Sequence, residues 1–209
     1  MTLRIGVTGP IGCGKSAVAA ALSTRGGVVV DADQLTRAAT APGSPALREI
    51  EGRFGAGVIA LDGSLDRAAL ARVVFADAAA LRDLEAIVHP AVRPLIERAV
   101  AAAESAGAPL VVVEAIKLVE AGYAARCDEV WLVTCTPEEQ RARLARRGVP
   151  PDEIERRIAS QGGDLIDRLR PRATRVVDAG GPLRRTERRA LQALDAAVAV
   201  RASPRGAAP

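Results

Sequence analysis

The chain has 209 residues, of which 49% are hydrophobic and 2% aromatic, with a formal net charge of +4 at pH 7. This length suits one α/β domain, with or without insertions, around a core of Ala, Val, Leu and Ile. No apolar run of about twenty residues and no signal-peptide pattern occurs, so we expect a soluble, cytoplasmic protein with no membrane partner. Its arginines are interleaved with acids and aromatic residues are few, so we also expect no nucleic-acid partner.

The first predicted elements surround a glycine-rich loop. Residues 3–8 read as an apolar strand, and residues 15–24 as an Ala-rich helix. Between them lies Gly-Pro-Ile-Gly-Cys-Gly-Lys-Ser, residues 9–16, which fits the P-loop pattern G-x-x-x-x-G-K-[ST]. Such glycines let the backbone N–H groups point at phosphates, and the lysine then reaches the β- and γ-phosphates. The order of strand, loop and helix predicts a nucleoside triphosphate site.

A second strand is predicted at Val28–Val30, buried and parallel, and it runs into Asp31-Ala32-Asp33. Ligands of α/β sheets bind beyond the carboxyl ends of the strands, so we expect at least one of these carboxylates beside the P-loop. There it would take a proton from an acceptor hydroxyl or hold Mg²⁺ through water. The alternative is that they cap a helix over residues 34–39.

Helices dominate residues 35–105, with predicted segments at 46–54, 67–76, 77–88 and 91–105. The insertion is longer than a crossover needs, which predicts a lobe over the acceptor site. His89, the only histidine, precedes Pro90, and together they are predicted to break the helix. A side chain at such a break can face a cleft, whereas a buried or capping histidine is the alternative.

Three further strands complete the prediction. Residues 110–113 form a buried strand that ends in Glu114, an acid placed to orient Mg²⁺ or its water shell. Residues 130–134 form the fourth strand. Residues 173–178 form the fifth and lead to Gly180-Gly181, a loop able to approach a base closely. Residues 186–200 are predicted as a closing helix, and residues 202–209 as a disordered tail.

After the fourth strand, Thr136 is predicted to begin a helix that presents Gln140, Arg143 and Arg147 on one face. A second helix follows at residues 152–161. Two arginine-bearing helices at this position indicate a mobile lid that closes on phosphates, although an ordinary charged hairpin is the alternative.

Cysteines and lysines are both scarce. The three cysteines, Cys13, Cys127 and Cys135, are odd in number and lack metal-ligand spacing, which indicates a reducing compartment. Cys127 and Cys135 are predicted to be small core or strand-end residues.

Lys15 and Lys117 are the only lysines among 29 basic residues. Their scarcity suggests a specific role for each, with a chance surface lysine as the alternative for Lys117.

Together these motifs resemble the dephospho-CoA kinase family over nearly the whole chain. The matching fragments are, in order, residues 7–16, 31–33, 65–70 with 74–75, 87–90, 140–144, 159–161 and 172–180. The resemblance implies an α/β fold with a five-stranded parallel sheet, that of an NMP-kinase-like P-loop kinase. It divides a single domain, residues 1–201, into a core (1–34, 108–136 and 163–201), a helical acceptor lobe (35–107) and a lid (137–162).

The resemblance also implies an activity, transfer of the ATP γ-phosphoryl group to the ribose 3′-hydroxyl of dephospho-CoA, the last step of coenzyme A biosynthesis. Asp33 would be the base, helped by Lys15 and Arg143. ATP would contact Thr8, Gly9, Pro10, Ile11, Gly12, Cys13, Gly14, Lys15, Ser16, Ala17, Arg143, Arg147 and Gly180. The acceptor would contact Asp31, Asp33, Arg67, His89 and Lys117, and Mg²⁺ would be held by Ser16 and Glu114.

The chain departs from the family pattern at three places. Pro10 stands where glycine is usual, which fixes φ and removes an N–H group. Ala17 replaces a hydroxyl residue. Glu114-Ala-Ile-Lys-Leu stands where aspartate, a small residue and Pro-Leu-Leu are common. We hypothesise that Lys117 contacts an acceptor phosphate.

Other classes of protein remain as alternatives. Another small-molecule or nucleotide P-loop kinase would share the loop and lid and differ in the acceptor lobe. A GTPase-like switch would need an Asn-Lys-x-Asp motif, which the sequence lacks. A nucleic-acid-binding module would show strongly salt-dependent binding. The expected oligomeric state is a monomer or a weak homo-oligomer.

Overall fold

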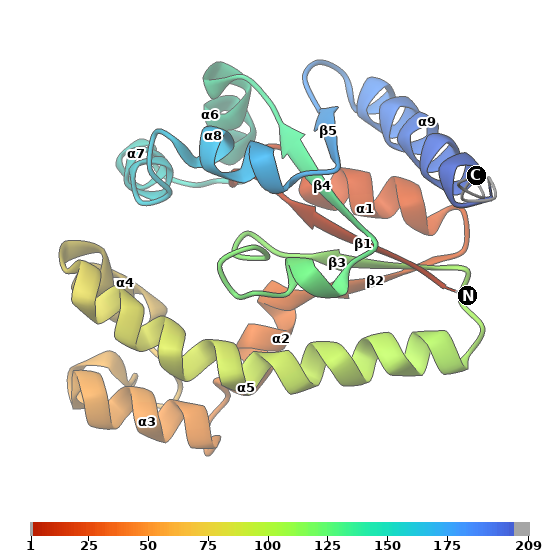
Figure 1. Ribbon diagram of the computed structural model, residues 1–209. Coiled ribbons are helices and arrows are strands. Elements are labelled where there is room, and N and C mark those ends of the chain that lie inside the picture. The colour runs from red at the N-terminus through yellow and green to blue at the C-terminus, as the bar shows by residue number, and fades with distance from the viewer. Residues whose placement is uncertain (1, 203–209) are drawn as a thin grey trace. The chain divides into compact units, whose positions relative to one another are not determined.

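The computed structural model describes residues 2–202, in which strands and helices alternate. The strands are β1 (Leu3–Thr8), β2 (Gly27–Asp31), β3 (Leu110–Glu114), β4 (Glu129–Thr134) and β5 (Arg175–Asp178). They form one sheet in the order β2-β3-β1-β4-β5 (Figure 1). β1 pairs in parallel with β3 and with β4, and β4 pairs in parallel with β5. The predicted α/β fold with a five-stranded parallel sheet is confirmed.

The main helices are α1 (Lys15–Ser23), α2 (Ala32–Ala39), α3 (Pro45–Phe54), α4 (Arg67–Ala76), α5 (Ala78–Ser105), α6 (Pro137–Arg146), α7 (Pro151–Ala159), α8 (Leu165–Leu169) and α9 (Leu183–Ala202). The chain divides into two compact units: unit 1 holds residues 1–29 and 107–209, and unit 2 holds residues 30–106. Beyond Ala202, the tail predicted over residues 202–209 lies outside the described residues. No helix in residues 2–202 is long and apolar enough to cross a membrane.

The core of unit 1 lies between the sheet and two helices. α1 and α9 pack side by side (Figure 1). Their apolar residues join those of β1, β3, β4 and β5 in one buried cluster. β3 lies inside the sheet, and Val111, Val112 and Val113 are at most 1% exposed, as predicted. A continuous β-branched run is typical of a strand that is covered on both faces.

β2 is less buried than the sequence predicts. Val28 and Val29 are 39% and 38% exposed, although their β-branched run was expected to form a buried strand. The reason is the position of β2 at the end of the strand order, where one edge has no neighbouring strand. Periodicity cannot distinguish an edge strand from a central one when every side chain is apolar.

Unit 2 is built on the long helix α5, against which α2, α3 and α4 pack. Its buried cluster joins Ile50, Val58, Leu70, Val74 and Ala80, and the apolar residues packed against it include several from the N-terminal half of α5. Burial of these faces, rather than helix propensity, accounts for most of the stability of such short helices.

The predicted helix break at His89-Pro90 is wrong, because α5 runs without interruption through Pro90 and Pro94. Each proline removes one hydrogen bond to the carbonyl four residues earlier, at Ala86 and Pro90 respectively. Ala86, Pro90 and Pro94 are all exposed, so water can bind the carbonyls that lose their partners. His89 therefore lies half-buried within a continuous helix.

Candidate active site

The P-loop connects the end of β1 to the start of α1. Gly9, Gly12 and Gly14 have φ angles of +140°, +76° and +97°, in the left-handed region that glycine tolerates best. Gly14 is the N-cap of α1, so the loop leads directly into the N-terminus of a helix. The loop therefore has the conformation that a phosphate cradle needs.

Gly9 has no room for a side chain, because a Cβ atom would lie 2.2 Å from the carbonyl oxygen of Val133 on β4. We expect Gly9→Ala to destabilise the protein by about 3 kcal/mol, the combined cost of backbone strain and overpacking, or roughly 6–12 °C in Tm. Gly63→Ala is the matched control, since Gly63 has a φ of +77° with nothing within 4 Å. Equal Tm losses in thermal unfolding would contradict the steric explanation.

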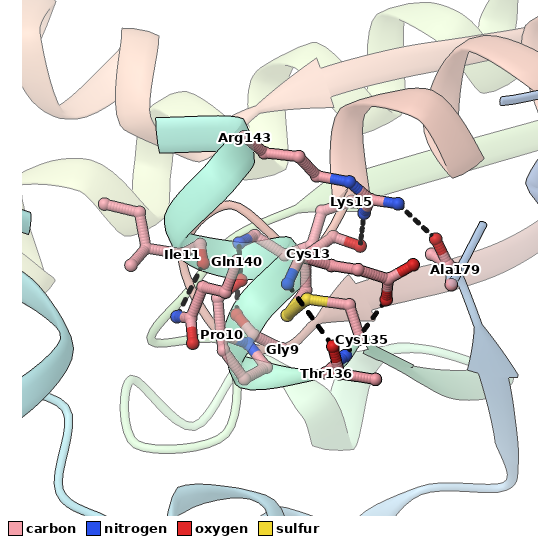
Figure 2. Close-up of a disulfide and its surroundings, with 12 residues drawn as sticks. Gly9, Pro10, Ile11, Cys13, Lys15, Cys135, Thr136, Gln140, Arg143 and Ala179 are labelled. Atoms are coloured by element: carbon pink, nitrogen blue, oxygen red, sulfur yellow. Dashed lines mark hydrogen bonds between the residues drawn. A yellow bond between two sulfur atoms is a disulfide. The ribbon is translucent and has the colours of Figure 1, made fainter. Parts of the chain in front are cut away.

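Lys15 is the catalytic lysine candidate, and its side chain is 6% exposed. Its ammonium group donates hydrogen bonds to the carbonyl oxygens of Gly9 (3.0 Å) and Pro10 (3.2 Å) (Figure 2). The positive charge is thus held inside the curl of the loop, where a lysine can act on a bound phosphate as a point charge.

The two predicted Mg²⁺ ligands lie together. Ser16, at the start of α1, donates its hydroxyl hydrogen to Oε1 of Glu114 at the end of β3, over 2.7 Å. These are oxygen ligands, which Mg²⁺ prefers, and kinase sites add phosphate oxygens and water to one or two carboxylates. Within residues 2–202 no group of three or more His, Cys, Asp or Glu side chains could hold a metal. The pair thus fits an ion whose remaining ligands come from a nucleotide and from water.

Thr8 has a structural contact. Its side chain is buried, and its hydroxyl donates to the carbonyl oxygen of Ile116 at 3.0 Å. This bond ties the end of β1 to the segment after β3, which includes the exposed residue Lys117. Ala17, in the first turn of α1, is partly buried.

α6 is attached to the P-loop. Gln140, on its buried side, donates from Nε2 to the carbonyl oxygen of Ile11 at 2.8 Å. Arg143 donates from Nη1 to the carbonyl oxygen of Cys13 at 3.2 Å and from Nη2 to that of Ala179 (Figure 2). Arg143 thus connects the loop to the segment after β5. Arg147 is exposed at the C-terminal end of α6.

The segment after β5 is organised by carboxylates. The N–H group of Gly180 donates to Oδ1 of Asp178 at 2.8 Å, and that of Gly181 donates to Glu139 of α6. The hydrogen bond from the N–H group of Gly181 lowers the pKa of Glu139 most, and the hydrogen bond from the N–H group of Thr136 lowers it further. Glu139 is also the N3 residue of the capping box that Thr136 forms, as predicted.

Gln161 has no role predicted from the sequence, yet its Oε1 accepts a hydrogen bond from the N–H group of Ile11 at 3.0 Å. The two peptide groups that flank Ile11 are therefore bound by Gln140 and Gln161. Gln161 lies just beyond α7, 150 residues from its partner, so no local pattern could reveal the contact.

Cys13 and Cys135 form a disulfide, a pairing that the sequence did not predict (Figure 2). Cys13 lies in the P-loop and is 1% exposed, and Cys135 is the residue after β4 and is partly exposed. Their Cα atoms are 5.1 Å apart, although 122 residues separate them in the chain. An odd number of cysteines does not indicate pairing, so only the fold brings them together.

Cys127 lies outside the disulfide, and burial raises the pKa of its thiol to about 12. The thiol therefore stays protonated well above the pH at which an ordinary cysteine ionises, and the protonated form is a poor nucleophile. We expect iodoacetamide at pH 8 to leave Cys127 unmodified in the native protein and to alkylate it after denaturation, as measured by mass spectrometry. Rapid alkylation of the native protein would contradict this assignment.

In unit 2, Asp31 caps α2: its Oδ1 accepts hydrogen bonds from the N–H groups of Asp33 (2.9 Å) and Gln34 (3.1 Å). β2 ends at Asp31 and α2 begins at Ala32, so the capping alternative holds for Asp31, and Asp33 lies within the helix. Asp33 is exposed in the first turn of α2.

Arg67 lies at the start of α4 and donates from Nη2 to the hydroxyl of Thr40 at 2.9 Å. Burial and the nearby charge of Arg37 lower its pKa, but a guanidinium group remains charged. Neighbouring positive charges attract an anion.

The parallel sheet, the P-loop with its buried lysine, the Ser16–Glu114 pair and the helices after β4 define a P-loop kinase. A model of the dephospho-CoA kinase family matches residues 3–184. A dephospho-CoA kinase of Symbiobacterium thermophilum is 48% identical over 87% of this chain and 76% of its own length. The chain therefore belongs to the dephospho-CoA kinase family. This confirms the resemblance seen in the sequence: the chain is an enzyme, a kinase that phosphorylates dephospho-CoA with ATP.

Solved structures agree with the fold. The Thermus thermophilus protein TT1252 has a TM-score of 0.77 at 38% identity and covers 94% of this chain and 98% of its own. Dephospho-CoA kinase from Campylobacter jejuni has a TM-score of 0.66, over 96% of this chain and 100% of its own. Its identity of 20% makes this second likeness evidence for the fold alone.

Proposed function

We propose that unit 1 binds Mg·ATP at the P-loop, and that Asp33 activates the ribose 3′-hydroxyl of dephospho-CoA for attack on the γ-phosphate. The observation that carries the ATP site is the loop itself, with three left-handed glycines and Lys15 buried inside the curl. The family relationship supports the acceptor and the product, coenzyme A.

ATP binding in this proposal uses backbone N–H groups of the loop 9–16, in which Pro10 has none, and the charge of Lys15. Arg143 aids catalysis: its bonds to the carbonyls of Cys13, Ala179 and Gly181 use only part of its five N–H groups, which leaves donors for phosphate oxygens. Gly180 and the neighbouring backbone would contact the base. Arg147, exposed on the same helix, would add charge from the proposed lid, residues 137–162.

Ser16 and Glu114 would hold Mg²⁺. Held there, Mg²⁺ would supply positive charge to neutralise the phosphates. Their hydrogen bond at 2.7 Å supports this role, because it keeps two oxygen ligands from different elements together before a nucleotide binds.

Asp33 would orient the 3′-hydroxyl and accept its proton as the oxygen attacks. Residues 35–107 would form the acceptor lobe, in which the Arg37–Arg67 cation pair supports binding of an acceptor phosphate. Asp31 and His89 would complete the acceptor site. Closure of the lid would exclude water, so that the γ-phosphoryl group is transferred to the acceptor and not to water.

Lys117 gives this proposal a specific test. If its ammonium binds an acceptor phosphate, Lys117→Ala should raise the acceptor KM about tenfold, the cost of one exposed charge-assisted hydrogen bond, and leave the ATP KM unchanged. Steady-state kinetics with each substrate varied in turn measure both constants. An unchanged acceptor KM would remove Lys117 from the acceptor site.

We place this activity in the cytoplasm, where ATP is available, and assign it to a monomer or weak homo-oligomer that does not bind nucleic acid. The site of phosphorylation is tested with dephospho-CoA whose ribose 3′-hydroxyl is replaced by hydrogen. This analogue should compete with dephospho-CoA and gain no phosphoryl group in a mass measurement. Phosphorylation of the analogue would contradict the assignment of the 3′-hydroxyl and favour another acceptor.

A further inference from the structure

The disulfide between Cys13 and Cys135 lies inside the nucleotide site and not in a distant structural region. We propose that this pair is a reversible thiol–disulfide modification site that sets the affinity of the P-loop for nucleotide, with tighter binding in the disulfide form. The inference rests on one part of the proposed function, the binding of ATP at the P-loop.

The bond joins the P-loop to the start of α6. Cys135 immediately precedes Thr136, the N-cap of α6, and two further residues of α6, Gln140 and Arg143, donate hydrogen bonds to carbonyls of the loop (Figure 2). The loop also packs closely on this helix, because a Cβ atom on Gly12 would lie 3.1 Å from Cγ of Leu144. The disulfide is thus the covalent member of a set of contacts that hold the loop on α6.

Reduction of the disulfide would leave the P-loop more conformational freedom. Cys13 lies between Gly12 and Gly14, both in the left-handed region, and glycine gives a chain more conformational freedom than any other residue. Binding of phosphate must then order the loop, which costs affinity, whereas a loop already fixed in the binding conformation has less entropy to lose. We therefore expect the reduced form to bind nucleotide three- to tenfold more weakly.

The exposure of the two sulfur-bearing residues indicates how the bond opens and closes. Cys135 is partly exposed and Cys13 is 1% exposed, so a small thiolate would attack the sulfur of Cys135 and release Cys13 as a thiolate. A second small thiol then frees Cys135, and the two small thiols leave as their disulfide. The reverse reaction takes two electrons from the protein thiols and gives them to a small-molecule disulfide such as oxidised glutathione. In a reducing compartment such a bond is transient and senses redox state.

The test compares the full chain equilibrated in oxidised and in reduced glutathione. Alkylation after denaturation should count one thiol, Cys127, in the oxidised form and three in the reduced form. The Kd for ADP, measured by titration calorimetry, should be three- to tenfold higher in the reduced form. Cys135→Ser, or Cys135→Ala if the serine variant does not fold, should bind as weakly as the reduced protein in both buffers. Cys127→Ser should respond to glutathione as the unmodified protein does.

Three results would overturn the proposal: three thiols after equilibration with oxidised glutathione, equal Kd values in the two buffers, or tighter binding after reduction. A disulfide that is only structural would raise Tm, as expected for closure of a loop of this length, and leave Kd unchanged. Because nucleotide affinity and not turnover is measured, an incorrect acceptor would not change the outcome. A failure of the redox proposal can therefore be distinguished from a failure of the proposed function.

Discussion

Replacing Asp33 with asparagine is expected to lower kcat for phosphorylation of dephospho-CoA by about a thousandfold, within the range typical of a lost general base. Asparagine keeps the size and hydrogen-bonding ability of the side chain but cannot accept the proton of the 3′-hydroxyl at neutral pH. The Kd for ATP should stay unchanged, because in this proposal Asp33 contacts the acceptor hydroxyl and not the nucleotide. Rapid-quench turnover and calorimetric titration measure the two quantities.

The matched control is Asp77→Asn. Asp77 is also an aspartate of unit 2, but its role is to cap α5. Asparagine caps a helix as well as aspartate does, so the substitution should preserve the structure. This control variant should keep full kcat. If Asp33→Asn retained more than a tenth of the turnover, the assignment of Asp33 as the base would be wrong.

The second large effect is expected from Lys15→Ala. Removal of the ammonium group should lower kcat/KM for ATP by at least about a hundredfold, the usual cost of a lost electrostatic contact to the transferring group. It also leaves the carbonyls of Gly9 and Pro10 without their bonds to this ammonium group. Steady-state kinetics with ATP varied, together with the Kd for ADP, separate the loss of catalysis from the loss of binding.

Arg25→Ala serves as the control for a lost positive charge in unit 1. Arg25 lies just after α1, where it forms an exposed ion pair with Asp195 at 3.6 Å, a type of contact that contributes little. This variant should change neither constant by more than about twofold, since surface substitutions rarely exceed 0.5 kcal/mol. Similar losses in the two variants would show that net charge, and not the position of Lys15, governs the rate.

The P-loop could be predicted from the sequence because its physics is local. The spacing of the glycines before Lys15-Ser16 fixes the curl of the backbone, and the flanking apolar strand and helix confirm it without tertiary information. The same holds for the start of α6, where Thr136, Pro137 and Glu139 form a capping box that the sequence shows directly. The buried valines of β3 followed by Glu114 belong to this group as well.

Contacts that depend on the fold could not be predicted. Cys13 meets Cys135, and Ile11 meets Gln161, only because the parallel sheet and the helices after β4 bring distant segments together. The continuous helix through Pro90 and Pro94 depends on both prolines facing solvent, which a propensity-based prediction does not consider. The exposure of Val28 and Val29 depends on the position of β2 at the sheet edge, which only the strand order gives.

The most direct test of the assigned activity is ADP release with Mg·ATP, compared for dephospho-CoA, for AMP and for no acceptor. We expect release to be stimulated by dephospho-CoA alone, with one phosphoryl group added to it in the mass spectrum. Stimulation by AMP, or no stimulation by dephospho-CoA in protein that still binds ATP, would contradict the account of the acceptor.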